Sequence, residues 1–122
     1  GFDMGDVRAA DLDLSVRGED GFQLVGSSSM REISRDPMDL VAQTFGPHHQ
    51  YPDGAMLFLG TLFTPTQDRD APGMGFTHKP GDIVSIRSAR FGTLTNRVVH
   101  TDAAPPWTFG VRALYRAIAA SA

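Results

Sequence analysis

Hydrophobic and polar residues alternate along two neighbouring stretches near the N-terminus. Leu12, Leu14 and Val16 alternate with aspartate and serine, and the alternation resumes at Phe22 after a turn bounded by glycines. A period of two is typical of strands that bury one face of a sheet. The pattern therefore predicts a β-hairpin over residues 11–28.

Two segments instead show the spacing of short helices, over about residues 37–45 and 111–120. Either Ser34 or Asp36 can cap the first helix, and Pro37 suits its first position. This helix has only two to three turns, so we expect it to be stabilised by packing on the sheet. The first ten residues show no clear period.

The run from Ala55 to Leu59 contains no polar residue and predicts a strand buried on both faces. Further strands are predicted from Ile83 and over about residues 94–99. Between them, residues 64–81 are rich in Pro, Gly, Asp and Thr and predict a long loop of the kind that often carries function. The order predicts an α+β fold that is mostly antiparallel.

Composition narrows the function classes. The chain has 122 residues, a net charge of −3, scattered basic residues and no cysteine. Disulfides and thiolate metal sites are thereby excluded, and binding to nucleic acid or to an anionic membrane is not expected. No apolar run approaches the roughly 18 residues that span a bilayer. We expect one domain over residues 1–122, in the cytoplasm.

Few residues suggest chemistry by themselves. The adjacent His48 and His49 would point to opposite sides of a strand, which favours a surface loop over a metal site. Ser27–Ser29 lies in no nucleophile elbow and is interpreted as the polar end of a strand. Thr61, after Gly60 at the end of the predicted buried strand, could meet a ligand where the backbone comes close.

The tightest charge cluster is Gln67–Asp70, within the long loop. Two interpretations remain open. The cluster is either a solvated group of charges that pair with one another, or a lid that presents polar groups to a ligand.

The order of several short motifs resembles the C-terminal part of the fumarylacetoacetate hydrolase superfamily. These motifs are Gly26–Ser29 with Arg35, Tyr51–Gly54, Gly60–Thr61, Lys79–Val84 and Gly92–Val98. Two further segments resemble the branch of 2-keto-3-deoxy sugar-acid dehydratases, namely Pro65–Gly73 with Gly75–Lys79, and Asp102–Gly110. The resemblance covers roughly residues 10–100, and it rests on order and spacing more than on any single motif.

This resemblance implies that residues 1–122 are the C-terminal portion of a catalytic domain with a mixed, mostly antiparallel β-roll. It also implies that the parent protein is a metal-dependent lyase or hydrolase that acts on a 2-oxo acid. In the family, Mg²⁺ held by a Glu-x-Glu motif and an aspartate binds the 2-oxo-carboxylate and stabilises an enolate. The resemblance assigns substrate binding to Gly60, Thr61, Gln67, Asp68 and Arg69, with Thr61 near the carboxylate. It also implies a homodimer.

The metal ligands are the main departure from the family pattern. The chain contains only Glu19 and Glu32, so it has no Glu-x-Glu motif. We expect the ligands to lie upstream, on a longer parent chain. The alternative is a catalytically incompetent fragment or a stand-alone binding or assembly β-domain.

Overall fold

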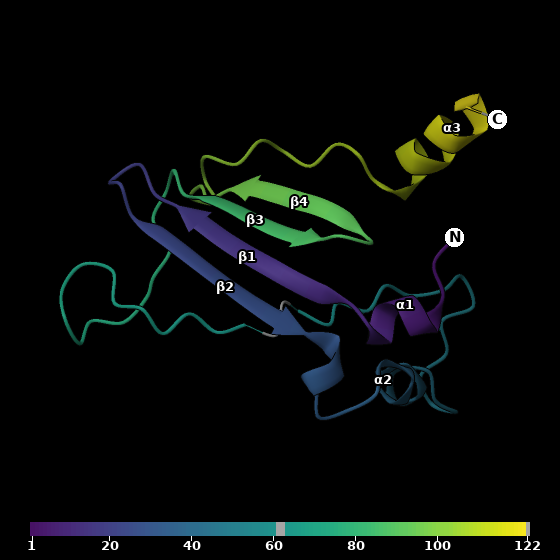
Figure 1. The fold of residues 1–122 in the computed structure, drawn as a ribbon. Coiled ribbons are helices and arrows are strands. Elements are labelled where there is room, and N and C mark those ends of the chain that lie inside the picture. Colours follow the sequence, from purple (N-terminus) through teal and green to yellow (C-terminus); the bar gives the residue numbers. More distant parts are fainter. Residues whose placement is uncertain (61–62, 122) are drawn as a thin grey trace.

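The computed structural model describes residues 1–60 and 63–121, and in this part of the chain it contains a four-stranded sheet and three α-helices (Figure 1). The sheet order is β2-β1-β3-β4, and each neighbouring pair is antiparallel. An α+β fold with antiparallel pairing is therefore confirmed. In chain order the elements are α1 (Met4–Arg8), β1 (Asp11–Arg17), β2 (Gln23–Ser29), the 3₁₀ turn η1 (Met30–Glu32), α2 (Pro37–Thr44), β3 (Ile83–Ser88), β4 (Gly92–Arg97) and α3 (Val111–Ser121).

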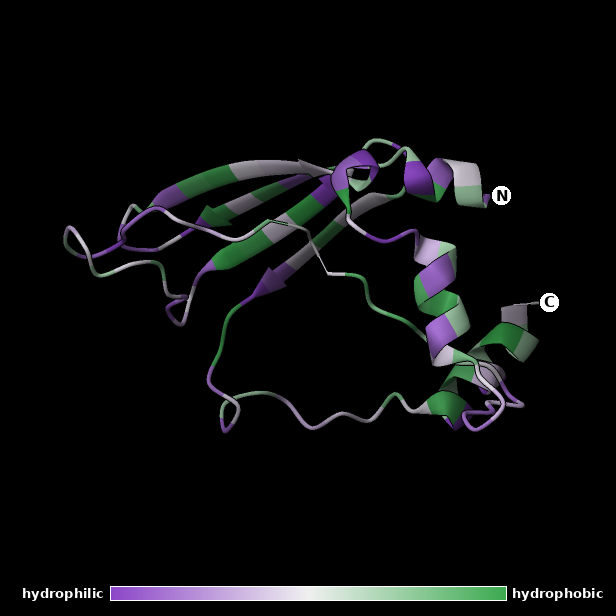
Figure 2. Cartoon of the chain, turned by 90° about the horizontal axis from the view of Figure 1, so that it is seen from below, coloured by the Kyte–Doolittle hydropathy of each residue, from purple (hydrophilic) through white to green (hydrophobic). Residues whose placement is uncertain are grey.

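The predicted hairpin is formed by β1 and β2, and it supplies the centre of the core. Val16 is paired with Leu24 on one side and with Val84 of β3 on the other. The core cluster consists of three buried residues, Leu14, Val16 and Leu24. Phe76, from the long loop, packs against this cluster. Hydrophobic and hydrophilic positions alternate along the strands, as the period of two requires (Figure 2).

Gly26 makes room for an aromatic ring on this sheet. It lies opposite Leu14 in the β1–β2 register. A Cβ atom on Gly26 would lie 2.2 Å from Cζ of Phe63, closer than real side chains approach. The absence of a side chain therefore lets the ring of Phe63, the residue just before the long loop, pack directly on β2.

The first predicted helix begins as its sequence indicates, but it is packed differently. The Asp36 side chain accepts a hydrogen bond from the Met38 amide at 2.8 Å, and Pro37 stands in the first turn of α2. The prediction that α2 packs on the sheet is wrong, because Pro37 is its only buried residue and Met38 is 47% exposed. Helix α2 is attached to α1 instead, because Arg8 of α1 forms an ion pair at 2.5 Å with Asp36, the capping residue of α2.

Helix α1 was not predicted. The described residues therefore contain three α-helices, whereas the sequence predicts two. Its signal is a capping box, in which the Asp3 side chain accepts from the Asp6 amide at 2.9 Å and Asp6 accepts from the Asp3 amide at 3.1 Å. The helix has five residues, too short for a hydrophobic period to be visible in the sequence.

The predicted strand at Ala55–Leu59 is wrong for the structure described here. These residues adopt no regular structure, and Met56 and Phe58 are 79% and 83% exposed. An apolar run forms a strand only where a neighbouring strand offers backbone groups, and neither edge strand of the sheet, β2 or β4, pairs with it. The last strand is also shifted, to Gly92–Arg97, because Gly92 with φ of 92° closes the β3–β4 hairpin opposite Ser88.

Helix α3 forms where predicted, over Val111–Ser121. An irregular segment, residues 98–110, leads from β4 to α3, which lies beyond the sheet and covers neither of its faces (Figure 1). No helix in the described ranges is both long enough and apolar enough to cross a membrane.

Candidate functional site

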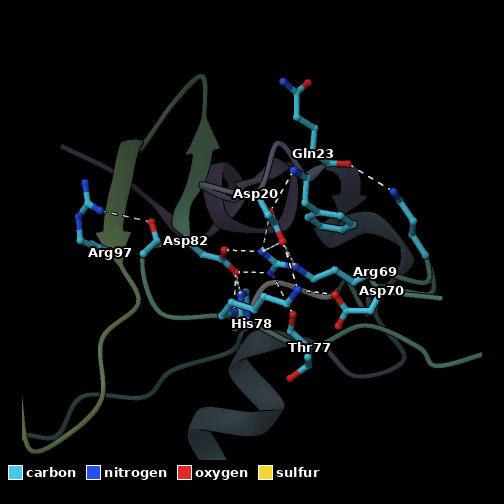
Figure 3. Close-up of polar contacts among 12 residues, drawn as sticks. Asp20, Gln23, Arg69, Asp70, Thr77, His78, Asp82 and Arg97 are labelled. Atoms are coloured by element: carbon cyan, nitrogen blue, oxygen red, sulfur yellow. Dashed lines mark hydrogen bonds and ion pairs between the residues drawn. The ribbon is translucent and has the colours of Figure 1, made fainter.

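Two residues of the predicted lid, Arg69 and Asp70, join an ion network beside the turn between β1 and β2 (Figure 3). We call this network the Arg69 cluster. It consists of Arg69, Asp82, Asp20, Lys79 and Asp70.

The turn before β3 fixes the position of Asp82. Gly81 adopts a φ of 94°, a left-handed conformation that favours glycine, and its amide donates to the Val98 carbonyl at 2.9 Å. The Val98 amide donates to the Asp82 carbonyl at 2.8 Å. The Asp82 carboxylate in turn accepts from the Lys79 amide at 2.9 Å. The turn is thereby attached to the end of β4, with Asp82 directed inward.

Arg69 and Asp82 form a buried two-point ion pair. Nη1 and Nη2 of Arg69 donate to the two carboxylate oxygens of Asp82 at 2.6 and 2.7 Å. Each side chain is only 1% exposed. Such paired, charge-assisted hydrogen bonds fix geometry as well as energy.

The remaining donors of Arg69 are also used within the protein. Nε and Nη2 donate to Asp20 at 3.4 and 3.2 Å, and Nη1 donates to the Thr77 carbonyl at 3.1 Å. The guanidinium lies 4.6 Å from the centre of the Phe22 ring. All five N–H groups thus have protein acceptors, so Arg69 holds the loop to the β1–β2 turn.

The backbone approaches this cluster closely at Gly18. A Cβ atom there would lie 2.3 Å from Oδ1 of Asp20 and 2.5 Å from Nη2 of Arg69. Because both groups are held by ion pairs, they have little room to move aside. Gly18 is therefore part of the cluster's packing.

The ion pairs shift the ionisation of their members. Arg69 holds the pKa of Asp82 well below its usual range, and Asp82 raises the pKa of Arg69. Hydrogen bonds to Asp70 and Asp20 raise the pKa of Lys79. Hydrogen bonds lower the pKa of Asp20, the largest effect coming from the Phe22 amide and smaller ones from Lys79 and Arg69. Arg69, Asp82, Lys79 and Asp20 are therefore all charged at neutral pH.

The other predicted site residues are distributed along the loop. Asp68 accepts from the Gly73 and Gly75 amides at 2.7 and 2.6 Å, which lowers its pKa and folds the loop tip. Gln67 donates to the Gln23 carbonyl at 3.4 Å. The four residues 67–70 thus make their contacts outside the group, so they are not a set of charges that pair with one another.

Gly60 is exposed, with φ of 77° and open space around it. It makes no hydrogen bond to Gln67, Asp68 or Arg69 within residues 1–60 and 63–121. Thr61 lies outside the described residues. The assignment of Gly60 and Thr61 to substrate binding stays a prediction.

Sequence reasoning missed the partners of Arg69. Asp20 and Asp82 lie 49 and 13 residues from it along the chain, and no local pattern pairs them. The sequence offers one local signal for this pairing. Pro80–Asp82 predicts a tight turn, and the Asp82 side chain emerges from it.

Two other polar groups offer weaker geometry. A shallow depression of about 330 Å³ is lined by Ser28, Ser29, Glu32, Ile33 and Ser34, and Ser29 already donates to Asp11 at 2.6 Å. Nδ1 of His78 lies 3.6 Å from Asp82. No group of three or more His, Asp or Glu side chains suited to a metal ion occurs among the described residues. These residues therefore do not fit the Mg²⁺ site that the family resemblance implies.

The low pKa of Asp82 predicts a specific loss of stability in acid. Folding favours the ionised carboxylate, so its contribution is complete above the unfolded-state pKa of about 3.9 and declines as the pH falls below that value. We expect the free energy of unfolding, measured by urea titration at a series of pH values, to fall less steeply below about pH 4 in Asp82→Asn than in the wild type. Asp13→Asn, which removes an exposed carboxylate on β1, should keep the wild-type slope. Equal acid slopes for wild type and Asp82→Asn would contradict the assignment.

Comparison of the sequence with protein-family models and with curated proteins, and of the fold with solved structures, finds no match.

Proposed function

We propose that this chain forms part of a metal-dependent lyase or hydrolase that acts on a 2-oxo acid, with dehydration of a 2-keto-3-deoxy sugar acid as its reaction. The proposal includes a β-roll of the fumarylacetoacetate hydrolase type, a cytoplasmic location and assembly as a homodimer. It rests on the order and spacing of several short motifs along the chain, and not on any single motif.

The observation that supports it best is the contact between two of those motifs. Asp82, from Pro80–Asp82, forms the buried ion pair with Arg69, from the dehydratase-like segment. The base of the loop is therefore fixed, while its tip at residues 71–75 is exposed. A loop that is fixed at its base and open at its tip suits a wall or lid of a ligand pocket.

In this proposal the residues have separate roles. The Thr61 hydroxyl and the neighbouring amides hold the substrate carboxylate, and Gly60 leaves space for the substrate to approach the backbone. Gln67 and Asp68 line the pocket. Arg69 is a positioning residue, because its donors already bind Asp82, Asp20 and Thr77. The metal ligands come from protein outside these 122 residues.

Substitution of Thr61 tests the assignment in the gene-encoded protein that contains this chain. We expect Thr61→Ala to lower kcat for the 2-oxo acid about 100-fold, the scale of losing one preorganised donor. Thr61→Ser should retain most of the activity because it keeps the hydroxyl. Thr64→Ala, at an exposed loop position, is the matched control and should behave like wild type. Unchanged kcat in Thr61→Ala would remove Thr61 from the site.

A second candidate function is a binding or assembly domain without catalysis. It is favoured by the lack of a metal-binding group in the described ranges and by the extent of exposed apolar surface. The two candidates differ in one measurable property. Only the enzyme turns over a 2-oxo acid in a reaction that chelation of the metal abolishes.

A further inference from the structure

The sequence contains two Asp-Gly pairs, and both lie in exposed turns with the same hydrogen bond. The pairs are Asp20–Gly21, between β1 and β2, and Asp53–Gly54, after α2. In each turn the glycine amide donates to the carbonyl three residues earlier, at 3.2 Å for Gly21 and at 2.9 Å for Gly54. The two glycines have φ of 82° and 88°, with open space where a Cβ atom would lie. The two backbones are therefore alike, whereas the surroundings of the two aspartates differ.

An Asp-Gly pair isomerises without an enzyme. The glycine nitrogen attacks the side-chain carboxyl carbon of the aspartate, and its proton and a carboxyl oxygen leave as water while a succinimide ring closes. Water then opens the ring at either carbonyl carbon, which yields aspartate or isoaspartate. In isoaspartate the main chain passes through the former side-chain carboxyl, and the former main-chain carboxyl becomes the side chain.

The groups around an aspartate determine how fast this reaction proceeds. Glycine as the next residue favours it, because no Cβ atom obstructs the attacking nitrogen. The reaction passes through a neutral ring, so a cation that binds the carboxylate opposes it. Hydrogen bonds that hold the carboxylate in place also oppose it, because the carboxyl carbon has to reach the glycine nitrogen.

Three groups hold the Asp20 carboxylate in place. It accepts from the Phe22 amide at 3.1 Å, from Nη2 of Arg69 at 3.2 Å and from Nζ of Lys79 at 3.2 Å. A neutral ring at this position would take one anionic acceptor from Arg69 and one from Lys79. Movement of the carboxylate toward the Gly21 nitrogen would break the same hydrogen bonds. The Arg69 cluster therefore opposes isomerisation at Asp20.

Nothing comparable holds the Asp53 carboxylate. Its side chain makes no hydrogen bond or ion pair within residues 1–60 and 63–121. Residues 51–58 are all exposed, so this turn can open without disturbing the buried cluster of the sheet. The Asp53 carboxyl carbon can therefore approach the Gly54 nitrogen at no cost in ion pairs or buried contacts.

We propose that Asp53 is the site at which this chain forms isoaspartate, and that the Arg69 cluster protects Asp20 from the same reaction. The modification keeps a carboxylate at residue 53 but adds a methylene group to the main chain. It thereby alters the turn that leads into residues 55–60. The inference holds whether or not the chain serves in catalysis.

Peptide mapping after prolonged incubation at neutral pH tests the assignment in the gene-encoded protein that contains this chain. Trypsin, which cleaves after Lys and Arg, places the two Asp-Gly pairs in separate peptides, residues 18–31 and 36–69. Electron-transfer fragmentation distinguishes isoaspartate from aspartate, although their masses are equal. We expect isoaspartate to accumulate several-fold faster at Asp53 than at Asp20. Asp53→Glu should abolish the signal from the 36–69 peptide, because glutamate would have to close a larger ring.

Two comparisons separate the effect of the fold from that of the local sequence. Concentrated urea removes the ion pairs, so the difference between Asp53 and Asp20 should become smaller there. Lys79→Gln removes one partner of Asp20 at a side chain that is 37% exposed, and it should raise isoaspartate at Asp20 but not at Asp53. The proposal is overturned by absence of isoaspartate at Asp53, by equal accumulation at both sites in the folded protein, or by a ratio that urea leaves unchanged. A Lys79→Gln variant without any rise at Asp20 would contradict the protection by the Arg69 cluster.

Discussion

Replacement of Arg69 by methionine is expected to lower the free energy of unfolding by about 3–5 kcal/mol, the usual cost of removing one member of a buried ion pair. Methionine keeps much of the side-chain volume but leaves the Asp82 carboxylate, 1% exposed, with the Lys79 amide and His78 as its remaining neighbours in the described residues. It also removes the donors to Asp20, which keeps Lys79, and to the Thr77 carbonyl. Urea denaturation followed by circular dichroism measures the change.

The matched control for this prediction is Arg97→Met. Arg97 pairs with Glu19 at 3.0 Å, but the two side chains are 56% and 73% exposed. Exposed pairs of this kind contribute about 0–1 kcal/mol. In addition, the double variant Arg69→Met/Asp82→Leu should recover part of the loss, because it leaves no unpaired charge. Equal effects of Arg69→Met and Arg97→Met would contradict the structural role of the cluster.

Truncation of Leu24 to alanine is expected to cost about 2–5 kcal/mol. Leu24 is 3% exposed and packs with Leu14 and Val16 in the buried cluster, against which Phe63 and Phe76 also pack. Alanine removes its buried side chain and leaves a cavity among these neighbours. The change in urea midpoint, with an unchanged slope, measures it.

The adjacent residue supplies the control for the core prediction. Val25 lies on the opposite face of β2 and is 80% exposed. Val25→Ala should change the stability by less than about 0.5 kcal/mol. A large loss in Val25→Ala together with a small one in Leu24→Ala would mean that the other face of β2 is the buried one, a register shift of one residue.

The features predicted correctly from sequence are those that a local pattern determines. The β1–β2 hairpin follows from the alternation at Leu12–Val16, because a period of two places every apolar side chain of a strand on the same face of the sheet. The start of α2 follows from Asp36 and Pro37, whose effects are confined to one turn. Helix α3 follows from the spacing of Leu114, Tyr115 and Ile118.

The features predicted incorrectly, or missed, depend on partners that the local pattern does not contain. The run Ala55–Leu59 carries a strand-like composition, but no strand of the described sheet pairs with it. Helix α2 fully buries only Pro37 and leaves Met38 47% exposed. Arg69 could be singled out by its position in a charged loop, whereas its capture by Asp82 and Asp20 requires the fold that brings the loop to the β1–β2 turn.

Steady-state turnover of a 2-keto-3-deoxy sugar acid by the gene-encoded protein that contains this chain tests the central claim most directly. The protein would be assayed as purified, after treatment with EDTA, and after Mg²⁺ is restored. We predict loss of the 2-keto-3-deoxy acid that EDTA abolishes, that Mg²⁺ restores, and that Thr61→Ala reduces while Thr64→Ala does not. Absence of turnover with Mg²⁺ present, or turnover that EDTA leaves unchanged, would contradict the assignment to a metal-dependent enzyme of 2-oxo acids.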